Sequence, residues 1–299
     1  MSIDDVRAIA DAVLYEGYLL YPYRASSAKN RSRWQFGVLG PPHADPAAFA
    51  EAPGMTMQCL LEPGGRVGVW LRFLQLQARE VQRREPDGSW TAVPELTAGG
   101  ISLVSWDEAV ERELTLPEFD LAGSMRVPEF DLAGSMQVPV TVPGGVDVEE
   151  VVGARIVRRR WPLTARVRLS TQSDDGFDRL TVEVVNEHPA PVAGKDEAIR
   201  SSLIGAHLLV VAYRSRFVSL LEPPPAATGA AARCRQQRCW PVLAGAPGSA
   251  DVVLGAPIIL YDHPQVAEQS PGALFDSTEI DEILSLRVLT MTEAEKAEA

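Results

Sequence analysis

Two short motifs in this chain contain side chains that could do chemistry. Cys234 and Cys239 are separated by four residues, and the arginines around them could lower the pKa of a thiol and make it reactive. A structural zinc site needs a second pair of cysteine or histidine ligands, and no histidine lies within twenty residues of this pair. We therefore interpret the two cysteines as incidental loop residues, with a thiol-dependent metal carrier as the alternative.

The second motif is the pair Asp262 and His263, which follows the apolar run Pro257–Tyr261. A carboxylate and an imidazole are the usual groups for acid–base work. However, adjacent residues of an extended segment point to opposite sides, so a direct contact between these two side chains is not expected. The chain shows no nucleophile elbow, phosphate-binding loop or dinucleotide fingerprint, and no histidines at metal-ligand spacing. We predict no catalytic residue and no cofactor, and leave open whether the protein is an enzyme.

The densest cluster of recognition-type residues lies near the start of the sequence. Four of the six tyrosines fall between Tyr15 and Tyr23, and cations and a tryptophan follow. Tyrosine, tryptophan and arginine are enriched in protein interfaces, but tyrosines also pack in cores when their hydroxyl groups find partners. A binding surface and a core segment are thus both open. The residues that we expect to make a contact are Tyr15, Tyr18, Tyr21, Tyr23, Arg24, Lys29, Arg33 and Trp34.

The end of the chain offers a second candidate surface. Ile280, Ile283 and Leu284 are spaced to share one face of a helix, and Asp276 and Glu279 lie at its start. Carboxylates near a helix N-terminus are favourable for capping alone, and an acidic docking face is the functional alternative.

The elements that must position these residues are mostly strands. Alternating patterns predict strands over 67–73, 90–93, 163–169 and 180–184, and a pair over 207–213 and 216–221. After residue 73 the alternation slips by one residue, which indicates a bulge or bend. Helical spacing predicts a helix over 3–14. The expected fold is mainly β (α+β), an antiparallel β-sandwich-like core with short terminal helices, as a single domain over 1–299 or as two sub-lobes, 1–150 and 151–299.

An eleven-residue repeat interrupts this pattern. The stretch PEFDLAGSMRV at 117–127 recurs as PEFDLAGSMQV at 128–138. Two copies do not make a solenoid, so we interpret residues 117–138 as a duplicated loop insert.

Composition limits the classes of partner. The formal net charge of -12 argues against binding of nucleic acid or of anionic membranes. No apolar run approaches the roughly 20 residues of a membrane helix, so no membrane insertion is expected. The acidic start lacks the features of a signal peptide, and three cysteines do not suggest a disulfide scaffold. We expect a cytoplasmic protein.

Three stretches carry a resemblance to a known family: LYEGYLLYPYRASSAKNRSRWQFGVL, RFVSLLEPP, and PIILYDHPQVA with PGALFDSTEIDEILSLRVLTMT. The chain resembles a family of proteins encoded beside uptake NiFe hydrogenases and their maturation genes. The resemblance implies an accessory protein that assists hydrogenase assembly or maturation by protein–protein binding, with a hydrogenase subunit or maturation factor as partner. The alternative is an enzyme or a module for small anionic ligands, in which Arg24, Lys29 and Arg33 hold the anion and Asp262 or His263 does acid–base work.

Overall fold

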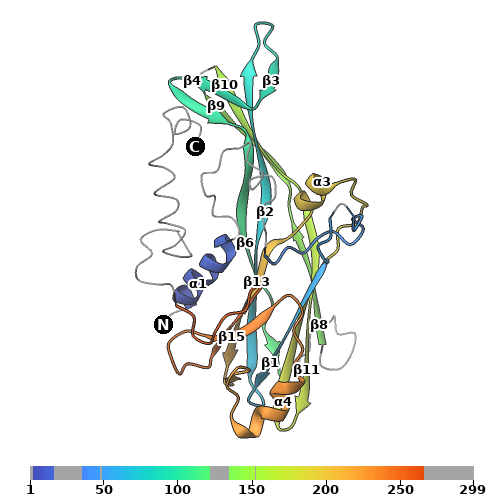
Figure 1. Ribbon diagram of the computed structural model, residues 1–299, viewed down its shortest axis with the longest axis vertical. Coiled ribbons are helices and arrows are strands. Elements are labelled where there is room, and N and C mark those ends of the chain that lie inside the picture. Colours follow the sequence, from blue (N-terminus) through green and yellow to red (C-terminus); the bar gives the residue numbers. More distant parts are fainter. Residues whose placement is uncertain (1–2, 17–35, 48, 122–134, 152, 266–299) are drawn as a thin grey trace.

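The computed structural model describes residues 3–16, 36–47, 49–121, 135–151 and 153–265. Figure 1 shows an elongated molecule in which the long strand β2 follows the long axis. The helices are α1 (Ile3–Glu16), α3 (Lys195–Arg200) and α4 (Thr228–Arg233), and a 3-10 turn spans Pro225–Ala227. The strands are β1 (Gly54–Leu61), β2 (Arg66–Arg84), β3 (Trp90–Val93), β4 (Glu95–Ala98), β5 (Ile101–Val104), β6 (Trp106–Thr115), β7 (Phe119–Asp120), β8 (Ser135–Val142), β9 (Gly145–Val151), β10 (Ala154–Arg160), β11 (Leu163–Asp174), β12 (Phe177–Asn186), β13 (Ile204–Tyr213), β14 (Phe217–Val218), β15 (Trp240–Ala244) and β16 (Val252–Ala256).

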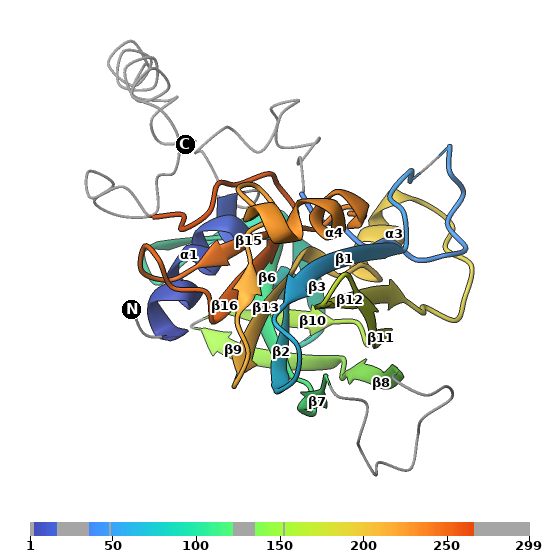
Figure 2. The same cartoon turned by 90° about the horizontal axis from the view of Figure 1, so that it is seen from below.

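Two antiparallel sheets face each other (Figure 2), which confirms the predicted mainly β, sandwich-like fold. Within the described residues, the smaller sheet has the order β14-β1-β12-β11-β8. The larger sheet has the order β15-β16-β13-β2-β10-β9, and β3, β6 and β7 pair with β2 along its other side. A short hairpin of β4 and β5 covers one end of the larger sheet, where Leu103 packs with Val81 and Ile156.

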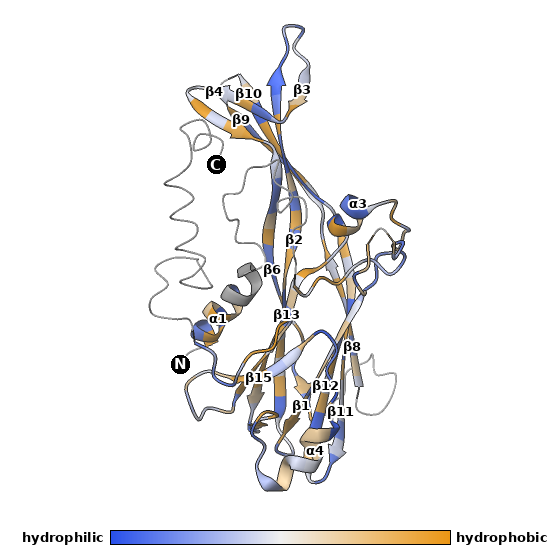
Figure 3. Cartoon of the chain, in the orientation of Figure 1, coloured by the Kyte–Doolittle hydropathy of each residue, from blue (hydrophilic) through white to orange (hydrophobic). Residues whose placement is uncertain are grey.

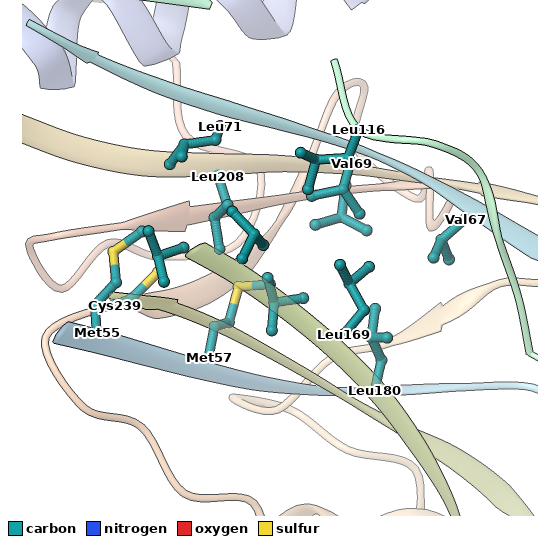
Figure 4. Packing of buried hydrophobic residues seen from close by; sticks show 14 of the residues in the cluster. Met55, Met57, Val67, Val69, Leu71, Leu116, Leu169, Leu180, Leu208 and Cys239 are labelled. Carbon is teal, nitrogen blue, oxygen red and sulfur yellow. The ribbon is translucent and has the colours of Figure 1, made fainter. Parts of the chain in front are cut away.

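The main core lies between the two sheets and is built by alternate residues of the strands (Figure 4). Met55, Met57 and Cys59 point inward from β1, and Leu208 and Val210 point inward from β13. The opposite face of β13 is also covered, because Leu209 packs with Val6 and Ile9 of α1. A strand that is covered on both faces needs an unbroken apolar run, and this explains the sequence of β13.

The two sheets share long strands that cross from one to the other. The chain of β8 continues through Pro143 and Gly144 into β9, and the chain of β10 continues through Trp161 and Pro162 into β11. Both crossings meet at the buried side chain of Gln75, whose Nε2 donates to the carbonyl oxygens of Trp161 (2.6 Å) and Pro143 (3.3 Å). The Oε1 of Gln75 accepts from Nε of Arg112 at 2.9 Å. One amide therefore joins the two crossings to β2 and β6.

The strands predicted at 90–93, 163–169 and 180–184 are present, and they pair in antiparallel fashion with strands that are close in the chain. Trp90–Val93 pairs with the end of β2, and β11 pairs with β12 over ten residues. The turn between β11 and β12 is Asp175-Gly176, and both residues have positive φ. Such a pair suits a two-residue hairpin turn, because its backbone twist matches that of the strands.

The predicted pairing of 207–213 with 216–221 is wrong. β13 pairs with β2 and β16, whereas β14 pairs with β1 in the other sheet. After β13 the chain crosses between the sheets, where Arg214 has a φ of 61° and Ser215 Oγ donates to the carbonyl of Glu62 at 2.7 Å. The short link between β13 and β14 thus takes the chain from one sheet to the other, although a link of this length would also fit a hairpin.

The slip in the alternation of β2 has a different cause from the one expected. β2 is a single strand, and the extra residue lies in β13, between Ile204 and His207. Leu74 and Leu76 of β2 are buried because they pack with Val38 and Ile204 in a separate cluster. The apolar positions change face along β2 because different elements cover its two faces.

The repeat at 117–138 is not wholly a loop insert. Phe119 and Asp120 of the first copy form β7 against β2, and Ser135–Val138 of the second copy begins β8. Phe119 and Met136 are buried in the main core. The two ends of the repeat are therefore held by the two sheets, and residues 122–134 lie outside the described part of the chain.

Candidate functional site

Asp262 and His263 lie beside the edge of β15 and use their polar groups on the backbone. The Oδ1 of Asp262 accepts the N–H of Leu243 at 2.8 Å, and the N–H of His263 donates to the carbonyl of Leu243 at 2.7 Å. The Oδ2 of Asp262 accepts from Ser219 Oγ at 2.5 Å. This pair of residues therefore continues the hydrogen bonding of the sheet past its last strand.

Serine, aspartate and histidine meet here without forming a catalytic relay. The ring of His263 lies 3.3 Å from the carbonyl of Gly245, through Nδ1, and not on Ser219. Ser219 Oγ donates directly to Asp262, and it accepts from the backbone N–H of Glu222 at 2.8 Å. A relay requires the imidazole between the carboxylate and the hydroxyl group. The arrangement fixes loops and gives Ser219 no imidazole base.

The two candidate thiols are poorly suited to bind a metal. Cys239 is buried in the main core, and burial raises the pKa of its thiol above the ordinary value. Burial also raises the pKa of the half-buried Cys234. Metals bind the thiolate, which a raised pKa disfavours. Among the residues that the structure describes, no group of three or more histidine, cysteine or acidic residues is placed to hold a metal ion.

The segment that leads to Asp262 carries exposed apolar side chains. Ile258 and Leu260 pack against the cluster under α1, so the alternate residues Ile259 and Tyr261 face outward and are 76% and 87% exposed. Figure 1 shows this orange-red segment after β16, on the side of the molecule where α1 lies.

Two further exposed apolar residues lie close to this segment. Leu221 belongs to a loop in which Ser219 is hydrogen-bonded to Asp262. Phe36 precedes Gly37, and the backbone of Gly37 lies so close to Pro257 that a Cβ atom built on this glycine would be 2.6 Å from the proline side chain. Both side chains are about half exposed, at 49% and 48%. We refer to Phe36, Leu221, Ile259 and Tyr261 as the Tyr261 patch. Exposed apolar groups gathered on one surface mark interaction sites more often than singly scattered ones do.

The structure relates this patch to the two segments that the sequence singled out. Residues 17–35 join the described chain at Glu16 of α1 and at Phe36, and residues 266–299 join it at Gln265. Phe36 is in the patch, and Gln265 is four residues beyond Tyr261. One attachment point of the first segment, Phe36, is thus in the patch, and the attachment point of the second segment follows Tyr261 closely in the chain.

Most of the predicted contact residues cannot be placed. Tyr15 lies in α1, with its side chain outside the described part of the structure. The remaining contact residues also lie outside the described residues, namely Tyr18, Tyr21, Tyr23, Arg24, Lys29, Arg33, Trp34, Asp276 and Glu279. The structure therefore leaves their predicted roles untested.

Sequence reasoning missed a buried charged cluster that holds α1. Arg72 of β2 is almost fully buried and pairs with Asp11 of α1 and with Glu111 and Glu113 of β6. The adjacent His207 is fully buried, and burial lowers its pKa to about 4. Its Nδ1 lies 2.9 Å from the carbonyl of Gly205, so this nitrogen carries the proton of the neutral ring. The apolar face of α1 predicts that this helix packs on the sheet, but it does not indicate the ion pair that also attaches the helix to Arg72.

The described chain contains no helix that is long and apolar enough to cross a membrane. No family model matches the sequence, and the comparison with curated proteins finds no match.

Proposed function

We propose that this protein is a non-catalytic accessory protein that assists assembly or maturation of a NiFe hydrogenase by binding a hydrogenase subunit or a maturation factor. The resemblance of the sequence motifs suggests the hydrogenase context. The observation that carries the binding role is the Tyr261 patch, in which four large apolar side chains on or beside the segment 257–261 are each exposed.

The position of the patch supports this role. Phe36 directly follows the segment 17–35, which contains the densest aromatic and arginine cluster, and Tyr261 comes shortly before the segment 266–299, which contains the acidic stretch around Asp276. Interfaces combine a central apolar area with aromatic and arginine anchors and a polar rim. The patch offers the apolar area, and the adjoining segments offer the anchors and the charges.

The alternative of an enzyme for a small anion loses its proposed acid–base pair. Asp262 accepts two hydrogen bonds that close the edge of β15, and the ring of His263 is directed to a backbone carbonyl. Both carboxylate oxygens of Asp262 accept hydrogen bonds within the fold, and the ring of His263 is held by another partner, so these two side chains do not form a coupled acid–base pair.

Co-purification from the native host tests the proposal. Tagged protein is recovered under mild conditions, and the proteins that accompany it are identified by mass spectrometry. We expect a hydrogenase subunit or a maturation factor with the native chain, and at least a tenfold lower recovery with the double variant Ile259→Asp, Tyr261→Asp. A buried aromatic anchor often contributes about 2 kcal/mol or more to binding, which corresponds to roughly thirtyfold in affinity.

Matched variants separate binding from folding. Ile101→Asp changes an equally apolar residue that is 62% exposed on β5, outside the patch, and should leave recovery unchanged. The double variant Tyr21→Ala, Arg24→Ala tests the N-terminal segment separately. Absence of every hydrogenase component with the native chain would refute the hydrogenase role, and equal loss with Ile101→Asp would refute the role of the patch.

A further inference from the structure

The strand β9 is an open edge of the larger sheet. Within the described residues it pairs with β10 alone, over all seven of its residues. Val146 and Val148 of β9 are both 54% exposed. Figure 1 places β9 towards the end of the molecule where β3 and β4 lie, away from β15, and Figure 3 shows hydrophobic colouring at this end.

The other edges in the described part of the chain are short or protected. Asp262 and His263 close the edge of β15, and β14 has only two residues. β8 contains Pro139, which has no N–H group to offer to another strand. β6 carries five charged residues in ten, and its Glu113 pairs with Arg7 of α1. Proteins use such devices against unwanted strand pairing, and β9 has charged residues, as β6 does, but lacks a proline and a bulge.

The two faces of β9 differ in chemistry. Val146 and Val148 lie on one face together with Glu150, and they stand opposite Arg159 and Val157 of β10. Asp147 and Glu149 lie on the other face, where Asp147 pairs with Arg160 and Glu149 with Arg158, each at 2.7 Å. The two carboxylate side chains are still 61% and 55% exposed, so each can accept a second cation.

We propose that β9 is a docking edge for an extended segment of a partner protein in which basic and aliphatic residues alternate. A strand added to β9 would bond its backbone to the open N–H and C=O groups, while its side chains alternate between the two faces. Over residues 146–149 they meet Val146 and Val148 on one face and Asp147 and Glu149 on the other, and Glu150 ends the valine face with a negative charge. The alternation in β9 therefore sets the alternation in the partner.

A second copy of this chain is a poor occupant of the same edge. Antiparallel pairing of two β9 strands about Val148 would put Asp147 opposite Glu149 twice, and parallel pairing in register would set equal charges side by side. Like charges that face each other across strands are destabilising. The net charge of -12 adds to the repulsion between copies and favours a basic partner.

Synthetic peptides test this proposal with the full chain and without any hydrogenase component. The probe is a fluorescent peptide of alternating lysine and valine, and its binding is followed by anisotropy. The control peptide has the same composition with all lysines before all valines. We expect the alternating peptide to bind at least tenfold more tightly than the control, since both carry the same charge. Equal binding of the two would overturn the proposal, because charge alone would then explain it.

Two further arms test the backbone pairing and the location. Two peptides are methylated on alternate amides, one on the odd and one on the even positions, and only the set that faces β9 should weaken binding tenfold or more. Equal binding of both methylated peptides would refute strand addition. On the protein, Val146→Lys with Val148→Lys should abolish binding, whereas Ile101→Lys on β5 should not. Unchanged binding of the β9 variant would place the site elsewhere. None of these results depends on the Tyr261 patch, so they can fail independently of the proposed function.

Discussion

Replacement of Gln75 by leucine should loosen the joint between the two sheets. The side chain is fully buried, and its amide donates to the carbonyls of Pro143 and Trp161 and accepts from Arg112. Gln75→Leu keeps the approximate size but leaves two carbonyl groups and one guanidinium group without this partner. An unsatisfied buried polar group costs about 1–3 kcal/mol, and the gain from burying leucine offsets part of the sum. We expect a loss of about 2–4 kcal/mol in the free energy of unfolding.

Chemical denaturation and a thermal scan measure this loss. For a chain of this size, the expected change lowers the melting temperature by about 5–10 °C. Gln172→Leu on β11 is the matched control, because Gln172 is exposed and should change stability by less than about 0.5 kcal/mol. If Gln75→Leu behaves like Gln172→Leu, the crossings are not held by this amide and our account of the joint is wrong.

Three other variants or modifications test the packing, an ion pair and the thiols. Gly255→Ala should lower the free energy of unfolding by about 1–3 kcal/mol, because the new Cβ would lie 2.9 Å from Cys239 Sγ and closer still to a methionine sulfur. The control Gly194→Ala meets no atom within 4 Å, so it should leave stability nearly unchanged when both variants are compared by urea unfolding. The Arg233 guanidinium holds the pKa of Asp174 below its ordinary value of 3.8, so this ion pair stabilises the fold above about pH 4 and is lost as the pH falls below that value. The stability difference between native chain and Asp174→Asn should accordingly be larger at pH 6 than at pH 3, and an equal difference at both would contradict this reading. In native protein at pH 8, a thiol reagent should modify Cys234 slowly and Cys239 only after unfolding, and prompt reaction of Cys239 would refute its burial.

Local patterns were sufficient to predict the strands that pair through short turns. The alternation in 163–169 and 180–184, with Asp175-Gly176 near the turn, contains all the information that the β11–β12 hairpin needs. The same holds for 90–93. Along β11 and β12 one face is buried and the other is more exposed, so the sequence period equals the structural one.

Long-range contacts were not predictable in the same way. Asp262 meets Leu243 and Ser219, which lie 19 and 43 residues away, so its role in closing a sheet edge is invisible in the sequence around it. Arg72 likewise finds Asp11 only because α1 packs on the neighbouring strands β13 and β16, and it finds Glu111 only through the pairing of β2 with β6.

The sequence contains one indication of the Tyr261 patch. Four apolar residues in a row, from Ile258 to Tyr261, precede a polar pair, and only two of the four turn inward. An apolar run can be buried on both faces or on one, and the sequence does not say whether a second layer covers it. Whether the run is buried on one face or on both depends on its neighbours in the fold. Ile258 and Leu260 pack on the cluster that includes α1, whereas Ile259 and Tyr261 stay exposed.

The central claim is that this protein serves hydrogenase assembly by binding through the Tyr261 patch. The most direct measurement is hydrogen uptake by native host cells that lack the gene, after complementation with the native chain, with Ile259→Asp, Tyr261→Asp, or with Ile101→Asp. We predict that uptake is low in the deletion strain, is restored by the native chain and by Ile101→Asp, and stays low with the double variant at equal protein level. Normal uptake in the deletion strain, or full restoration by the double variant, would contradict the claim.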